Sequence, residues 1–236
     1  MSLFLSHRGE SDDRPENTLS AFKLAMERDS DGIELDVRLS ADGFPVVVHD
    51  ADLKRVANVD APVSETALAR LQELHPVPLL AEVLRILKAG KHLQIELKGT
   101  DLAVVPAVKQ VLESWPGDRS QLAISSFEEE TIRRAGELFP DLPRLLLVDL
   151  EQKFGVFPTA AAVLAYMNLL GCTGVSFKAS FAADRAFVDE LRAGGLRVVC
   201  WGISSDELGL AMAEIGVDAM TCNHAVALRR KYRGDK

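Results

Sequence analysis

Short apolar runs alternate with segments of helical period along most of the chain, and this alternation limits the possible folds more than any other feature. Several of the runs are continuously apolar, which is typical of strands that are buried on both faces. Strands that alternate with helices favour a parallel sheet with right-handed crossovers. We expect strands at residues 3–6, 33–37, 46–48, 93–97, 122–125, 144–148, 174–177, 197–200 and 218–221.

The helical segments are marked by apolar residues three and four positions apart and by signals at their ends. One apolar stripe lies between the last two predicted strands and consists of Leu208, Ala211, Met212 and Ile215. Ser204 and Glu207 have the spacing of a capping box at its start, and Gly216 follows it as a stop signal. This stripe therefore predicts a helix between the two strands.

The number of strands favours a closed barrel. Residues 33–37 and 46–48 are joined by a turn with Asp42 and Gly43, which is too short for a crossover helix and predicts a hairpin. Eight parallel strands remain. The prediction is an α/β fold, a (β/α)8 TIM barrel with a small β-hairpin insertion after the second barrel strand, formed by residues 1–236 as one domain. An open doubly wound sheet is the alternative, but the Gly-rich turn usual near its first strand is missing.

Charge, cysteines and hydropathy argue against several classes of protein. A net charge of −8 is unfavourable for binding nucleic acid, whose phosphates require a broad basic surface. Cys172, Cys200 and Cys222 are far apart and odd in number, which argues against a disulfide framework or a zinc site. No secretory signal is visible, and no apolar run approaches the roughly 20 residues of a membrane span. We expect a cytoplasmic protein without stable membrane insertion.

Charged residues within otherwise apolar strands are the main indication of function. Glu34 and Asp36 lie two apart in one strand, and Glu96 and Lys98 lie two apart in the next parallel strand, so each pair shares a face. If the apolar residues between them face the helices, all four side chains point into the barrel near the carboxyl ends of the strands. Active sites of barrel enzymes lie at that end.

Three converging carboxylates repel one another unless a cation lies between them. Oxygen ligands alone suit a hard ion, so we expect one divalent cation, magnesium or calcium, at Glu34, Asp36 and Glu96. The alternative is a set of buried ion pairs, for instance Glu96 with Arg8 or with Lys98.

Two histidines end strands beside the acidic strand and are candidates for proton transfer. His7 ends the first strand, and His49 ends the predicted hairpin. Imidazole titrates near neutrality, which suits an acid–base pair in a phosphoryl displacement. Arg8 and Lys98 would then hold the phosphate oxygens. His75, His92 and His224 lie in positions that favour a structural role.

The first hundred residues resemble the glycerophosphodiester phosphodiesterase family. The motifs follow in the family's order: His7-Arg8-Gly9, Pro15-Glu16-Asn17-Thr18 with Ala21-Phe22, Glu34-Leu35-Asp36-Val37, Asp42-Gly43, Val48-His49-Asp50 and Glu96-Leu97-Lys98. Two segments depart from the family pattern, Arg55-Val56-Ala57 and Thr221-Cys222-Asn223-His224. Neither departure removes a candidate catalytic residue, but both leave the alcohol specificity open.

The resemblance implies a barrel of the phosphatidylinositol-phospholipase-C type that hydrolyses glycerophosphodiesters to sn-glycerol 3-phosphate and an alcohol. It implies metal ligands at Glu34, Asp36 and Glu96 and an acid–base pair of His7 and His49. In the first step His7 would be the base and His49 the acid, with the roles reversed in the second. Arg8 and Lys98 would contact the phosphate.

Several properties stay open at this point. Phe127 and Trp201 lie at strand ends and either line the glycerol pocket or fill the core. The substrate is expected to be a small glycerophosphodiester, but related barrels act on lysophospholipids or sphingolipids. An inactive barrel that serves as a binding module is the alternative of a different class. The leaving alcohol, the metal used in the cell and the formation of a homo-oligomer are not determined by the sequence.

Overall fold

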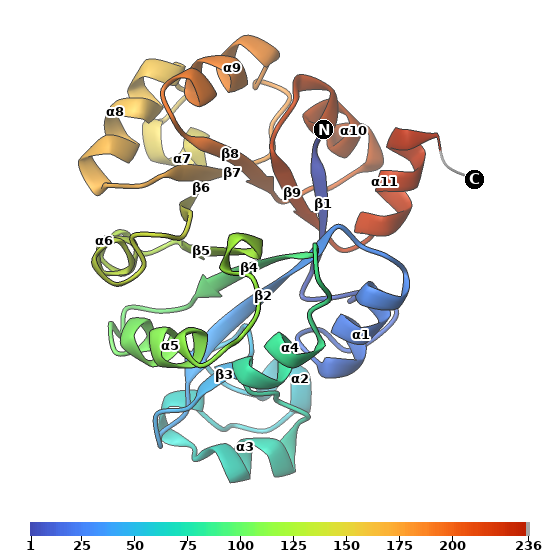
Figure 1. Cartoon of the computed structure of the whole chain (residues 1–236), viewed down its shortest axis with the longest axis vertical. Coiled ribbons are helices and arrows are strands. Elements are labelled where there is room, and N and C mark those ends of the chain that lie inside the picture. Colours follow the sequence, from blue (N-terminus) through green and yellow to red (C-terminus); the bar gives the residue numbers. More distant parts are fainter. Residues whose placement is uncertain (235–236) are drawn as a thin grey trace.

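The computed structural model describes residues 1–234, which form a closed ring of parallel strands surrounded by helices (Figure 1). Eight strands pair in the order β1-β9-β8-β7-β6-β5-β4-β2, and β1 also pairs with β2, which closes the ring. This is a TIM barrel, as predicted. The strands of the ring are β1 (Leu3–His7), β2 (Gly32–Leu39), β4 (His92–Leu97), β5 (Leu122–Ser126), β6 (Arg144–Val148), β7 (Gly174–Lys178), β8 (Arg197–Trp201) and β9 (Ala219–Cys222).

The ninth strand lies outside the ring, as the short turn after β2 predicted. Strand β3 (Pro45–Val47) runs antiparallel to β2, with Val37 opposite Val47. It is followed by a small set of helices that projects from the barrel at the bottom of Figure 1 and has its own apolar cluster. These elements are α2 (Lys54–Ala57), the 3₁₀ helix η1 (Val63–Glu65) and α3 (Leu68–Leu74).

The remaining helices pack around the outside of the ring. They are α1 (Leu19–Glu27), α4 (Leu80–Ile86), α5 (Val104–Glu113), α6 (Glu129–Leu138), α7 (Leu150–Phe154), α8 (Ala160–Leu170), α9 (Arg185–Ala193), α10 (Asp206–Ile215) and α11 (Ala225–Arg233), with the 3₁₀ helix η2 (Arg119–Gln121) before β5. Among residues 1–234, no helix is long and apolar enough to cross a membrane.

The start of α10 differs by one residue from the prediction. Ser205, not Ser204, is the extended residue before the helix, and its hydroxyl accepts a hydrogen bond from the Leu208 N–H. The cap must be three residues before its partner amide, so the register of the first turn selects Ser205. The stop signal is confirmed, because Gly216 ends the helix in the left-handed conformation with φ of 89°.

Alternation along the strands separates an apolar outer layer from a polar inner one. Leu35 and Ile95 are fully buried against the helices around β2 and β4. Their neighbours Glu34, Asp36 and Glu96 therefore face the inside of the barrel. The lower part of the interior is filled by an apolar cluster of Leu5, Ala123, Leu145, Val199 and Ala219, with Leu3 packed against it. Polar inner residues consequently gather above this layer, at the carboxyl ends of the strands.

Candidate active site

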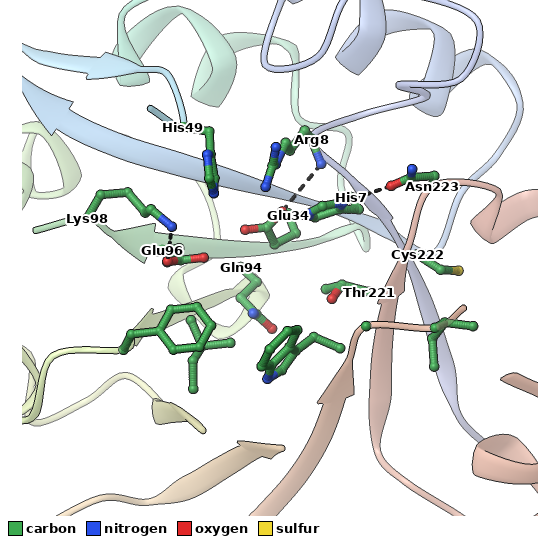
Figure 2. A pocket seen from close by; sticks show the side chains of 15 residues that line it. His7, Arg8, Glu34, His49, Gln94, Glu96, Lys98, Thr221, Cys222 and Asn223 are labelled. Atoms are coloured by element: carbon green, nitrogen blue, oxygen red, sulfur yellow. Dashed lines mark hydrogen bonds and ion pairs between the residues drawn. The ribbon is translucent and has the colours of Figure 1, made fainter. Parts of the chain in front are cut away.

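A cavity of about 340 Å³ opens at the carboxyl ends of the strands. Figure 2 shows its lining side chains converging from β1, β2, β4 and the segments that follow β3 and β9. Eight of the nine residues predicted for the site line this cavity: His7, Arg8, Glu34, His49, Glu96, Lys98, Phe127 and Trp201. The ninth, Asp36, is buried directly beside it. The structure thus brings together all the residues that the sequence suggested.

The three acidic residues form one cluster. Asp36 and Glu96 are paired across neighbouring strands, and Glu34 is two residues before Asp36 on the same face. Glu34, Asp36 and Glu96 each offer a carboxylate oxygen, and these oxygens lie within 4.8 Å of one another. All three side chains are buried, and Asp36 Oδ1 has no hydrogen-bond partner in the described structure. Its nearest cation is the Lys98 ammonium at 3.5 Å, so this buried oxygen is available to a metal ion.

Burial and mutual repulsion both raise the pKa of two acids of this cluster, Glu34 and Glu96. Burial, followed by the charges of Asp36 and Glu96, raises the pKa of Glu34 well above its ordinary value. Burial and the charge of Asp36 raise the pKa of Glu96 to about 7. Both shifts oppose the charged form that a cation would restore. The donor set is oxygen only, which fits magnesium or calcium better than zinc.

Two cations lie against the cluster and neutralise part of its charge. Lys98 Nζ is 2.6 Å from Glu96 and 3.5 Å from Asp36, so the predicted alternative pairing of Glu96 with Lys98 is present. Arg8 pairs with Asp36, at 3.1 Å, rather than with Glu96. Both side chains also line the cavity, where a phosphate could contact them.

The backbone of Arg8 is held in an uncommon conformation. Its φ is +57°, in the left-handed region that non-glycine residues seldom adopt. Its N–H donates to the Glu34 carbonyl, and its own carbonyl accepts from the Asn17 N–H, both at 3.0 Å. The next residue, Gly9, has no room for a Cβ, which would lie 2.7 Å from the Ala21 backbone. These contacts fix Arg8 at the cavity, and such strain is common at functional sites.

Each candidate catalytic imidazole is hydrogen-bonded through Nδ1. His7 Nδ1 lies 2.8 Å from Asn223 Oδ1, and His49 Nδ1 lies 2.7 Å from Asp50 Oδ1. His7 Nε2 points toward the acidic cluster, 3.9 Å from Glu34. Burial lowers the pKa of both histidines, and the Arg8 charge lowers the pKa of His7 further. These two oxygens accept hydrogen bonds from Nδ1–H, so Nε2 of each neutral ring is free to accept a proton.

Several residues of the site were not assigned a role from the sequence. Asn17 donates from Nδ2 to Asp36 Oδ2 at 2.8 Å, and Asn223 and Asp50 orient the two histidines. Asp50 directly follows His49, and Asn17 lies in a motif that pointed to the family. Their position beside predicted residues is the signal that could have indicated them. Asn223 lies 216 residues from His7, and only the closed barrel brings it there.

A network of ion pairs joins the two sides of the cavity. Glu16 accepts hydrogen bonds from Arg8 at 3.0 Å and from Arg55 at 2.6 Å, and Arg55 also pairs with Asp50 at 2.6 Å. Burial opposes ionisation of Glu16, but Arg55 and Arg8 together lower its pKa to about 2. Asp50 in turn holds His49. Arg55, the first residue of a segment that departs from the family pattern, thus links Arg8 to His49.

The aromatic residues form one wall of the cavity rather than core filling. The rings of Phe127 and Trp201 meet edge to face with their centroids 5.3 Å apart. Trp201 Nε1 donates to the Ser176 carbonyl, which fixes the indole. Lys98 Nζ lies 5.6 Å from the centroid of Phe127.

The other three histidines do not line this cavity. His224 pairs with Asp206, and His75 and His92 lie elsewhere. The three cysteines are free and buried, as expected.

Comparison with known proteins agrees with this geometry. The model of the glycerophosphoryl diester phosphodiesterase family matches residues 7–227. A glycerophosphodiester phosphodiesterase of Caldanaerobacter subterraneus subsp. tengcongensis is 28% identical, over 93% of each chain. The structure of a phosphodiesterase of Oleispira antarctica in complex with the product sn-glycerol-3-phosphate is 28% identical, with a TM-score of 0.85 over 97% of this chain and 96% of that one.

A third relative extends the likeness to another solved structure. The glycerophosphodiester phosphodiesterase of Thermotoga maritima is 25% identical, with a TM-score of 0.82 over 98% of both chains. The residues matched by the family model include the strands that bear the acidic cluster and both histidines, and the curated relative and the two solved structures each cover 93% or more of the chain. The chain is therefore a phosphoric diester hydrolase and belongs to the glycerophosphoryl diester phosphodiesterase family.

Proposed function

We propose that this chain, as one domain, hydrolyses small glycerophosphodiesters to sn-glycerol 3-phosphate and an alcohol in a reaction that requires a divalent cation and two histidines. The observation that supports this most directly is the placement of His7 and His49 in one cavity with a cluster of three buried carboxylates. The product named in the Oleispira antarctica complex supports the same choice of substrate.

Glu34, Asp36 and Glu96 would hold the cation, magnesium or calcium. When bound there, it would neutralise charge on the phosphoryl group and lower the pKa of the attacking hydroxyl. Arg8 and Lys98 would contact the non-bridging phosphate oxygens, because both line the cavity beside the cluster.

The two histidines divide the proton transfers. His7 accepts the proton of the glycerol 2-hydroxyl as its oxygen attacks phosphorus, and His49 donates a proton to the oxygen of the departing alcohol. The first step gives a cyclic phosphate and the free alcohol. His49 then takes a proton from water as it attacks phosphorus, and His7 returns its proton to the glycerol oxygen as the ring opens.

A lysophospholipid is the second candidate substrate, and one observation favours it. Phe181 and Val156 are 62% and 69% exposed, in segments that follow the carboxyl ends of β7 and β6. Apolar side chains near a cavity mouth are suited to a lipid surface. Micellar lysolipid and its deacylated counterpart, assayed side by side, separate the two candidates. Faster turnover of the micellar substrate would reject our preference for a water-soluble diester.

The main test measures sn-glycerol 3-phosphate released from glycerophosphocholine and glycerophosphoethanolamine, with magnesium, calcium or manganese present and after chelation. We expect turnover that disappears with chelator and returns with the ion. Glu96→Gln should abolish most of it, whereas His75→Ala, a histidine outside the cavity, should leave it unchanged. No turnover of any diester with any of the ions would reject the enzyme and leave the inactive binding module as the better explanation.

A further inference from the structure

A second, smaller cavity of about 250 Å³ lies beside the first one and shares Lys98 with it. It is lined on one side by Arg38 and on the other by the segment after β4, including Thr100 and Asp101, with Ser64 from η1. These residues are polar, and none of them belongs to the acidic cluster or the histidine pair. Leu39, Val63 and Val104 also line it, so the cavity has a mixed polar and apolar surface, and the proposed reaction assigns it no role.

Arg38 is the cation of this cavity that has no ion pair in the described part of the chain. It lies two residues after Asp36 on β2 and so shares the inner face of the strand, at its carboxyl end. Its Nε donates to the His49 carbonyl at 2.8 Å, which leaves the two terminal nitrogens of the guanidinium. Within residues 1–234, no carboxylate lies within 4.0 Å of it, although it is half-buried. Burial without an ion pair is unfavourable for a cation, so the unpaired nitrogens of this guanidinium can stabilise an anionic group in the cavity.

The surrounding charges do not replace such a partner. Burial lowers the pKa of Arg38, while the more distant charges of Asp36, Asp50 and Glu96 act in the opposite direction. Asp101, which lines the cavity, accepts a hydrogen bond from the Ala103 N–H at 2.9 Å and caps the turn before α5. The guanidinium thus lines this mixed cavity with N–H donors that no carboxylate of the described chain contacts.

The two histidines show which end of the substrate meets this cavity. His7 lies on the side of Asn223 and Thr221, whereas His49 lies toward Lys98, as Figure 2 shows. Under the proposed reaction the glycerol hydroxyl approaches His7 and the departing alcohol is next to His49. Because Arg38 bonds to the backbone of His49 and Lys98 lines both cavities, a departing alcohol next to His49 would have Arg38 in its direction.

We infer that the second cavity binds the leaving alcohol and that Arg38 favours glycerophosphodiesters whose leaving alcohol has a negative charge. A carboxylate is the simplest such group, and a guanidinium can hold it with two parallel hydrogen bonds. This inference rests on the proposed function and adds the substrate class to it. A diester with a cationic alcohol such as choline is expected to be a poorer substrate, because Arg38 would repel the positive charge.

The test uses three glycerophosphodiesters whose leaving alcohols are 3-hydroxypropanoate, 1-propanol and choline. For each, kcat/KM is measured in the wild type and in Arg38→Gln. We expect the ratio of the anionic to the neutral substrate to fall by about tenfold in the variant, the effect of one charge-assisted hydrogen bond. The variant also loses the hydrogen bond from Arg38 to the His49 carbonyl. Any general loss of activity from that change affects both substrates equally and cancels in the ratio of their kcat/KM values. Arg38→Lys, which keeps the charge, should retain part of the preference.

Two further variants complete the comparison. Asp101→Asn removes the anion of the cavity and should raise the ratio, while Arg70→Gln, an exposed arginine of α3, should leave it unchanged. If the diesters are hydrolysed but the ratio is the same in the wild type and Arg38→Gln, the subsite is rejected and the proposed function stands. If none of the three is hydrolysed, the proposed function itself fails, and the subsite with it.

Discussion

At the scale of single residues, the site depends on polar side chains that orient the candidate catalytic residues through hydrogen bonds and ion pairs. Asn223 and Asp50 each occupy Nδ1 of one histidine, which sets the tautomer that leaves Nε2 for the reaction. Arg55 connects Asp50 to Glu16 and thereby to Arg8. The geometry at the cavity is thus fixed by hydrogen bonds and ion pairs between neighbouring side chains, as is common for preorganised sites.

Replacing each histidine should distinguish the acid from the base. With an alkyl leaving group, His7→Ala and His49→Ala should each lose on the order of 10²–10⁴-fold in kcat. A diester whose leaving group is p-nitrophenol needs no proton on departure. That substrate should restore much of the first-step rate in His49→Ala, measured by p-nitrophenolate release, and not in His7→Ala. Equal rescue of both variants would contradict the assignment, and rescue of His7→Ala alone would reverse it.

The sequence was sufficient to select the candidate residues that the structure brings together at the cavity, and insufficient for those that position them. Glu34, Asp36 and Glu96 could be predicted because charge within an apolar strand is rare and alternation fixes the face. The pair of Arg55 and Glu16 joins residues 39 positions apart in loops beside the site, where no periodic pattern operates. Arg38 has the same alternation as Asp36, but its lack of an ion pair is visible only in three dimensions.

At the scale of elements, β2 is the strand on which the site is built. It bears Glu34, Asp36 and Arg38 on its inner face and pairs with three other strands, β1, β3 and β4. Its first residue, Gly32, has no space for a side chain, since a Cβ there would lie 2.3 Å from the His92 carbonyl oxygen. This close approach keeps β2 and β4 in the register that pairs Asp36 with Glu96.

Two glycine substitutions should therefore have opposite effects on stability. Gly32→Ala forces atoms into packed backbone and should destabilise the fold by about 1–3 kcal/mol. Gly136→Ala lies in the interior of α6, where the nearest atoms to a Cβ are at 3.6 Å, and should stabilise it by about 0.5–1 kcal/mol. Urea unfolding of both variants, with unchanged m-values, measures the two free energies. A Gly32→Ala protein as stable as the wild type would show that this contact does not constrain the barrel.

Element boundaries were predictable where the physical signal is strong. The eight barrel strands and the hairpin were recognised from apolar runs and from the short turn at Asp42 and Gly43. The cap of α10 was misplaced by one residue, because Ser204 and Ser205 are adjacent and only the helix register distinguishes them. The order of the strands in the ring could be predicted only through the general rule for crossovers.

At the scale of the whole molecule, the buried acidic cluster makes stability depend on pH. In the unfolded chain Glu96 loses its proton near its ordinary pKa of 4.5, whereas the folded protein holds that proton to about pH 7. Between these values the folded state binds more protons than the unfolded state, so stability falls as the pH rises. The raised pKa of Glu34 acts in the same direction. A bound divalent cation favours the charged carboxylates and removes this loss.

Thermal unfolding at several pH values tests this dependence. For the metal-free protein we expect the Tm to fall by roughly 5 °C between pH 5 and 7.5, relative to Glu96→Gln measured in parallel. Excess magnesium or calcium should raise the Tm more at pH 7.5 than at pH 5. Glu73→Gln, an exposed acid on α3, serves as the control and should follow the wild type. A Tm difference that is independent of pH would mean that the carboxylates are charged without a cation.

The closure of the ring by its first and last strands has a consequence for how the protein is made. β1 hydrogen-bonds to both β2 and β9, and His7 at its end is oriented by Asn223. At a translation rate of roughly 5–20 residues per second, β9 is synthesised about 10–40 s after β1. Nascent chains stalled with β9 still in the exit tunnel should therefore be inactive, and the same chains with a longer C-terminal tether should gain activity. Catalysis then begins only after the ribosome has finished the barrel.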